Sequence, residues 1–219
     1  MKKLSLIALS LVLVIGMLAG CGPAKPKPEE AQAYVKAVLD VICLGDYDHS
    51  VNITDIEQGK EGEVRDDVID QMLTALGGKG ISDDVTNRFK DCLIDAFSKA
   101  RYSVGDAVET DDGGYDVPVT IEPLQLFRGF NDNFESTLQA KVMADYDRVM
   151  AMSEAEQSDF IMDVVIDMMN DNLADPQYDA PETVTVHYGL MDEENNVYGC
   201  TSEEGEKLGE KIFSAEGMY

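Results

Sequence analysis

The fold is decided at residues 115–124, "YDVPVTIEPL", where the spacing of apolar side chains changes from a helical period to a period of two. Four apolar residues alternate there with four others: Tyr115, Val117, Val119 and Ile121 against Asp116, Pro118, Thr120 and Glu122. This alternation is typical of a strand with one buried face. The preceding "RYSVGDAVET" (101–110) and the turn "DDGG" (111–114) complete a predicted β-hairpin. Because proline cannot donate to a ladder, Pro118 indicates that this strand lies at a sheet edge or contains a bulge.

Helical patterns surround this hairpin, and a second hairpin follows them. Apolar side chains recur at helical spacing in residues 29–44, 61–76, 83–100 and 125–173, the last stretch containing two successive helices. Alternation returns at residues 184–190, and a short final helix follows Thr201. The predicted order is therefore three helices, a hairpin, two helices, a second hairpin and one helix.

Helices and hairpins that occur in separate runs indicate an α+β fold rather than a parallel α/β sheet. We predict three N-terminal helices, a helical pair inserted between the hairpins and a short C-terminal helix. The two hairpins would form one antiparallel sheet of about four strands, with the helices packed on one face. Residues 29–219 have the size of a single domain.

The N-terminus has the pattern of an export signal. Lys2 and Lys3 precede an apolar run that ends in "LAGC" at residues 18–21, so residues 1–20 form a predicted signal peptide. The "LAGC" sequence resembles the lipobox of bacterial lipoproteins, which implies cleavage before Cys21 and a diacylglyceryl group on its thiol. An ordinary signal peptide with a chance cysteine is the alternative. With Cys21, "GPAKPKP" forms a predicted stiff tether over residues 21–28.

The charge of the chain limits its partners. Asp and Glu number 43 against 17 Lys and Arg, which gives a formal net charge of −26. Such a balance excludes a nucleic-acid-binding role, which needs a basic surface. It also argues against electrostatic adsorption to anionic lipid and favours a cationic partner or divalent cations.

Three cysteines remain after Cys21, namely Cys43, Cys92 and Cys200. An extracytoplasmic compartment permits disulfides, but an odd number leaves at least one thiol unpaired. Cys43 and Cys92 both fall on apolar helix faces and are the preferred pair. The alternative is that all three are small buried apolar residues.

Residues 46–57 have the ligand spacing of a calcium-binding loop. Oxygen-bearing side chains occupy positions 1, 3, 5, 7, 9 and 12 of the loop: Asp46, Asp48, Ser50, Asn52, Thr54 and Glu57. Val51 stands at position 6, where an EF-hand requires glycine. The loop is therefore either a calcium site, for which Asp46, Asp48, Ser50, Asn52 and Glu57 are the candidate ligands, or a connection between two helices.

Signals for catalysis are sparse. The only histidines are His49 and His187, and the sequence contains no GxSxG, HExxH or CxxC motif. We predict that His187 lies on the exposed face of a strand, and we expect no cofactor. Methionine is more prominent in the helical pair: Met143, Met150, Met152, Met162, Met168 and Met169. These side chains could bind Cu(I), form an adaptable groove for a peptide or lipid, or fill part of the core.

The lipobox, the tether and "AYVKAVLDVICLGDYD" at residues 33–48 together resemble small surface lipoproteins of Gram-positive bacteria. The resemblance implies a cone-shaped α+β domain of the nuclear-transport-factor or cystatin type. We therefore expect a lipid-anchored protein on the extracytoplasmic face of the bacterial membrane. It would be a non-enzymatic module that binds an unknown protein or small molecule through the concave sheet or the Met-rich helices. A calcium-dependent structural or adhesion module through residues 46–57 is the second hypothesis, and a hydrolase is the least favoured.

Overall fold

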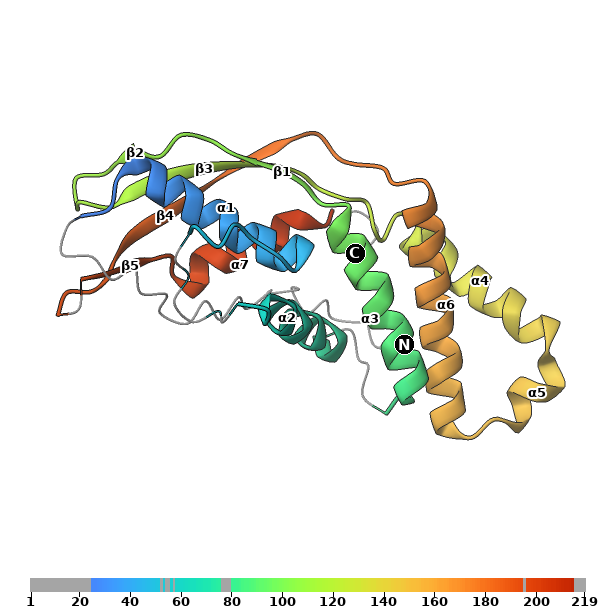
Figure 1. Ribbon diagram of the computed structural model, residues 1–219. Helices are drawn as coiled ribbons and strands as arrows, with labels where there is room; N and C mark the ends of the chain where they lie inside the picture. The colour runs from blue at the N-terminus through green and yellow to red at the C-terminus, as the bar shows by residue number, and fades with distance from the viewer. Residues whose placement is uncertain are drawn as a thin grey trace.

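The computed structural model describes residues 25–51, 53, 56, 58–75, 80–194 and 196–214 (Figure 1). The described residues form seven helices and one curled antiparallel sheet, which confirms the predicted α+β class. In chain order the elements are α1 (Pro28–Leu44), α2 (Glu61–Ala75), α3 (Asp83–Ser98), β1 (Arg101–Val104), β2 (Val108–Glu109), β3 (Tyr115–Glu122), α4 (Phe130–Ala144), α5 (Tyr146–Ala151), α6 (Glu154–Ala174), β4 (Glu182–Asp192), β5 (Val197–Gly199) and α7 (Ser202–Ile212). The predicted signal peptide and Cys21 lie outside the described residues.

The two predicted hairpins join into one sheet through β3 and β4. The strand order is β1-β3-β4-β5, and β2 pairs with β3 beside β1. All pairings are antiparallel, and Val119 of β3 lies opposite Val104 on one side and Val184 on the other. The strand that determines the fold is therefore central.

Of the two predicted arrangements for Pro118, the bulge is the one found, because β3 is not an edge strand and the register beside Pro118 shifts by one residue. Val104 pairs with Val119, whereas Val108, four residues later, pairs with Asp116, only three residues earlier. The Gly105 N–H donates to the Pro118 carbonyl oxygen at 2.8 Å, so the nitrogen of Pro118 faces the same neighbouring chain. That neighbour leaves the ladder there, since β1 ends at Val104 and β2 begins at Val108. Proline has no N–H to donate to the ladder, and the interruption means that no ladder bond is required at that point.

The close approach of Gly105 to Pro118 gives a testable prediction. A Cβ atom at position 105 would lie 2.9 Å from the Pro118 Cγ and 3.4 Å from its carbonyl oxygen. We expect Gly105→Ala to lower the free energy of unfolding by about 1–3 kcal/mol, as overpacking does. Urea unfolding measures the change. The matched control is Gly62→Ala in α2, where a Cβ meets nothing within 4 Å and helix propensity predicts a gain of up to ~1 kcal/mol. Equal stability of the two variants would refute the argument.

Helices α1 and α7 pack on the same face of the sheet, and α3 packs at its end (Figure 1). The four apolar residues of β3 are at most 3% exposed, as the alternation predicts. The Tyr34 ring of α1 lies 4.9 Å from Tyr188 of β4, and the Phe97 ring of α3 lies 5.1 Å from Phe213. The covered face of the sheet is thus filled by the protein's own side chains. The nuclear-transport-factor or cystatin-type cone is not confirmed and stays a prediction.

Candidate functional site

The described part of the 46–57 loop is organised by local hydrogen bonds. The Asp46 Oδ1 accepts the Tyr47 N–H at 2.8 Å, and the Asp48 Oδ1 accepts the Ser50 N–H at 2.9 Å. The second bond lowers the pKa of Asp48. Asn52, Thr54 and Glu57 lie outside the described residues. Calcium binding here stays a prediction.

The same loop is tied to the start of α2 by a histidine. The Nε2 of His49 lies 2.9 Å from the Oε1 of Glu61, a carboxylate that is buried. Glu61 also accepts the Gly59 N–H at 2.9 Å, which lowers the pKa of its carboxyl group. Ile53 is buried in the core beneath the loop. These contacts give the loop a structural role as a connection between α1 and α2.

The three described cysteines are free thiols, and all are buried. The predicted disulfide between Cys43 and Cys92 is therefore not formed in this structure, and the alternative of small buried apolar residues describes the three thiols. Burial raises the pKa of each of the three, Cys43, Cys92 and Cys200, to about 12. A thiol with such a pKa has almost no thiolate at neutral pH and reacts slowly.

His187 lies on the less covered face of the sheet, as predicted, where it is held between two carboxylates. Its Nδ1 is 3.1 Å from the Oδ1 of Asp116, and its Nε2 is 3.3 Å from the Oδ2 of Asp112. A Cβ at Gly114 or Gly189 would come within 2.7 Å of the imidazole ring, so glycine at both positions leaves room for it. The ring thereby fastens the β2–β3 turn to β4. Within the described ranges, no group of three His, Cys, Asp or Glu side chains is placed to hold a metal ion.

Helices α4 and α5, which we call the arm, form the outermost part of one end of the molecule. The arm comprises Phe130–Ala144 and Tyr146–Ala151, and neither helix contains a buried residue. In Figure 1 the arm lies on the outer side of α6, at the end of the molecule opposite β2 and β5. α4 packs against α6, and Lys141 of α4 forms an ion pair with Asp167 of α6. The arm is therefore packed on the domain, with Phe130 at the margin of the core, but it contributes no buried side chain.

The apolar stripe of the arm is only partly covered. Phe134, Leu138 and Val142 of α4 are half-buried against their neighbours. Met143, Tyr146 and Met150 are 66%, 51% and 65% exposed. The periodicity of the sequence identifies one stripe without the two methionines, but it does not show what covers this stripe. Its members are Phe134, Leu138, Val142, Tyr146 and Val149.

Two methionines of the helical pair are buried in the core and two are exposed on the arm. Met162 and Met169 of α6 are buried in the core that α6 forms with α3. Met143 and Met150 belong to the exposed surface of the arm. Core packing thus describes Met162 and Met169, and a binding groove that includes Met143 and Met150 stays a prediction.

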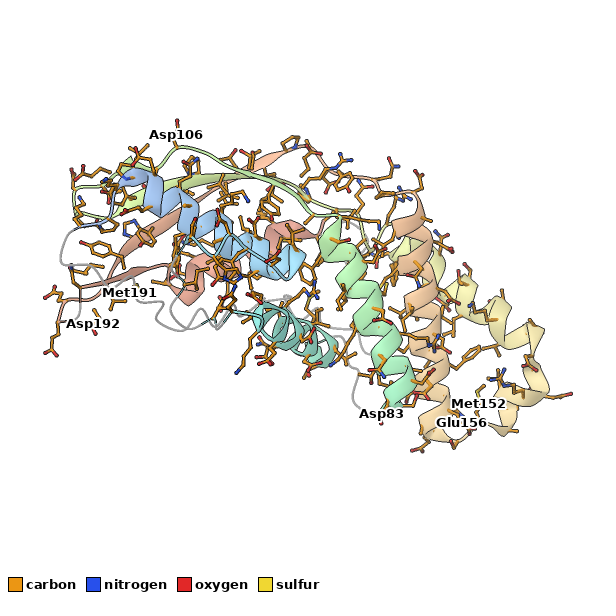
Figure 2. The ribbon with its side chains drawn as sticks, in the orientation of Figure 1. Asp83, Asp106, Met152, Glu156, Met191 and Asp192 are labelled. Atoms are coloured by element: carbon orange, nitrogen blue, oxygen red, sulfur yellow. The ribbon has the colours of Figure 1, made fainter. Side chains whose placement is uncertain are left out.

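A cleft of about 400 Å³ lies where the starts of α3 and α6 meet the arm. Figure 2 shows Met152 and Glu156 at this end of α6, close to Asp83 at the start of α3. The lining side chains come from three places in the chain: Ser82, Asp84, Val85 and Arg88; Arg148, Ala151 and Met152; and Glu156, Asp159, Phe160 and Asp163.

The charged groups of this cleft are largely occupied with one another. Arg88 forms an ion pair with Asp163 across the cleft, and its Nε lies 3.3 Å from the Oδ2 of Asp84. Asp159 accepts the Ser82 N–H at 2.7 Å. These bonds join α3 to α6, so the cleft serves first as a seam between the two helices.

These features define a class of molecule: an α+β domain with a curled antiparallel sheet, a helix-covered face and a projecting helical arm. The same fold is found in the crystal structure of the candidate lipoprotein ycdA from Bacillus subtilis, with a TM-score of 0.57 and 14% sequence identity. The match covers 84% of this chain and 56% of ycdA, so this chain spans little more than half the length of that protein. At this identity the likeness establishes the fold alone.

Comparison with protein-family models and with curated proteins gives no match. Among the helices that the structure describes, none is long and apolar enough to cross a bilayer.

Proposed function

We propose that this protein is a lipid-anchored, extracytoplasmic binding module that engages a protein partner through the arm and performs no catalysis. The observation that carries this proposal is the exposure of the arm. Its 21 helical residues contribute no buried side chain, and they expose Met143, Tyr146 and Met150. Helices in proteins draw most of their stability from packing an apolar face. A helix whose apolar side chains are exposed is suited to packing them against a partner protein.

The lipid anchor rests on two observations. The lipobox-like "LAGC" ends at Cys21, directly after an apolar run with a basic start. The protein that shares the fold, ycdA of Bacillus subtilis, is itself described as a candidate lipoprotein. Both favour attachment to the extracytoplasmic face of a bacterial membrane.

The structure favours a protein over a small molecule as the ligand. A small-molecule site in the sheet would need a hollow between the strands and α1, but Val117 and Val119 fill that face and are fully buried. The arm offers instead a projecting surface with an exposed aromatic ring. Residues 130–151 contain more acidic than basic side chains, so a partner with basic residues beside its apolar contact would fit best. The acidic residues are Asp132, Glu135, Asp145 and Asp147, and the basic ones are Lys141 and Arg148.

Photo-crosslinking in the cells that produce the protein tests this proposal. A photoreactive phenylalanine analogue at position 146 is expected to give a discrete crosslinked protein product, because Tyr146 lies in the exposed stripe of the arm. The matched control is position 44, since Leu44 is 53% exposed but lies at the end of α1. Adding Met150→Asp should reduce the product at position 146 by about tenfold or more, as expected for a contact worth ~1.4 kcal/mol or more. Equal products from positions 44 and 146, or none from 146, would refute binding through the arm.

A further inference from the structure

The first described residues of the chain are fastened to the sheet. Lys25 forms an ion pair with Glu109 of β2, and its Nζ lies 5.1 Å from the centre of the Tyr115 ring. The Tyr115 hydroxyl donates to the carbonyl oxygen of Pro26 at 2.6 Å. Tyr115 is only 3% exposed, so these contacts are made to a fixed part of the core. The tether is thus docked on β2 and β3 by three different interactions.

The docked segment continues into α1 without a break. The Lys27 N–H donates to the Oε2 of Glu30 at 2.8 Å, which caps the helix that begins at Pro28. One turn later, the Gln32 side chain donates to the Val104 carbonyl oxygen of β1 at 3.1 Å. From Lys25 onward the chain therefore belongs to the domain. Residues 25–28 of the predicted tether are part of it.

The docking of Lys25 limits how far the proposed anchor at Cys21 can reach from one end of the molecule. A chain that runs from Cys21 to Lys25 spans at most about 14 Å when fully extended. In Figure 1 the start of α1, β2 and β5 lie together at one end, and α5 lies at the other. Figure 2 shows Met191 and Asp192 at the first end and Met152 and Glu156 at the second.

We propose that the docked tether turns the β2–β3 end of the domain toward the lipid surface and holds the arm on the outward side. This inference rests on the proposed lipid anchor at Cys21. The arm then faces away from the membrane, where a partner protein can reach it. The docked tether therefore sets the direction in which the binding surface is displayed.

The charges of the membrane-facing end indicate that the anchor sets this orientation, and that electrostatic attraction of the protein surface to lipid headgroups does not. The β2–β3 end has exposed acidic residues, among them Glu109, Asp111 and Asp112, which anionic headgroups repel. Lys25, the basic residue nearest the anchor, is already paired with Glu109. Without the acyl chains, this end would have no electrostatic attraction to a bacterial membrane.

Energy transfer to a membrane dye tests the orientation. The lipidated protein, prepared from a bacterium that processes lipoproteins, is placed in vesicles with a headgroup-attached acceptor. A donor dye is introduced at Asp111→Cys, in the β2–β3 turn, or at Gln139→Cys, on the exposed side of α4. The slow reaction of the three buried thiols makes such labelling selective. We expect energy transfer to be several-fold higher from position 111 than from position 139.

Undocking the tether should reduce this difference. Lys25→Ala combined with Tyr115→Phe deletes the ion pair and the hydroxyl bond while keeping the buried ring. The transfer from the two positions should become less different, because the free chain then reaches to the start of α1 at Pro28 and the domain can tilt more widely on its anchor. The control is Lys27→Ala, which removes one positive charge from the same tether and leaves the contacts with Glu109 and Tyr115 in place. This variant should keep the full difference in energy transfer between positions 111 and 139.

The outcomes separate this inference from the proposed function. Mass spectrometry of the purified protein shows whether Cys21 bears a lipid, and an unmodified thiol would overturn both proposals. Lipidated protein that gives equal transfer from positions 111 and 139 would overturn the orientation alone. A double variant that behaves like the wild type would show that the docked tether does not set the orientation, and would also overturn it.

Discussion

Cys21→Ala is expected to move the protein from the membrane fraction to the soluble extracytoplasmic fraction. The acyl chains proposed for Cys21 would each add about 0.8 kcal/mol of membrane affinity per buried CH₂ group, and two or more chains hold a protein stably. The folded domain offers no substitute, because the chain has a net charge of −26 and anionic leaflets repel it. Fractionation of cells, followed by detergent phase partitioning, measures the change.

Two further variants make this result specific to the thiol. Cys21→Ser keeps nearly the same size but cannot form a thioether, so it should be released as completely as Cys21→Ala. Lys27→Ala alters the tether and leaves the thiol in place, so it should remain with the membrane. A membrane-bound Cys21→Ser variant would show that another part of the chain provides the attachment, and would refute the lipid anchor.

The fold could be predicted from the sequence where its cause is local. The alternation in β3 and the helical stripes of α1 and α3 depend on which face each residue occupies, and that follows from spacing alone. For Pro118 the sequence left an edge strand and a bulge open, because the choice between them depends on a distant segment. The interruption between β1 and β2, which accommodates the missing N–H, leaves no sign in the sequence of β3 itself.

The candidate site was only partly predictable for the same reason. Periodicity showed an apolar stripe with methionines on the helical pair, but the extent of its coverage depends on where α6 and the arm lie relative to α3. The preference for a Cys43–Cys92 disulfide assumed that two apolar helix faces bring their thiols together, whereas the structure buries each of them as a free thiol. The docking of Lys25 on Glu109 and Tyr115 joins positions far apart in sequence, and only the folded chain reveals it.

Phe97→Ala is expected to lower the free energy of unfolding by about 3–5 kcal/mol, the usual cost of truncating a fully buried phenylalanine. Phe97 has no exposed surface, and its ring lies 5.1 Å from Phe213 after α7, so its loss leaves a cavity between α3 and the C-terminal segment. The matched control is Phe134→Ala in α4. Phe134 is half-buried and stacks on Phe130 at 6.4 Å.

The contrast between the two phenylalanines decides whether the arm is part of the stabilising core. Because no residue of α4 is buried, Phe134→Ala should cost roughly 1 kcal/mol or less, in the range of partly exposed positions. Urea unfolding followed by circular dichroism measures both variants. If Phe134→Ala cost as much as Phe97→Ala, the apolar stripe of the arm would be needed for folding, and its exposure would no longer support a binding role. A small cost at Phe134 beside a large one at Phe97 would leave the arm as a helical surface that the domain displays without depending on it.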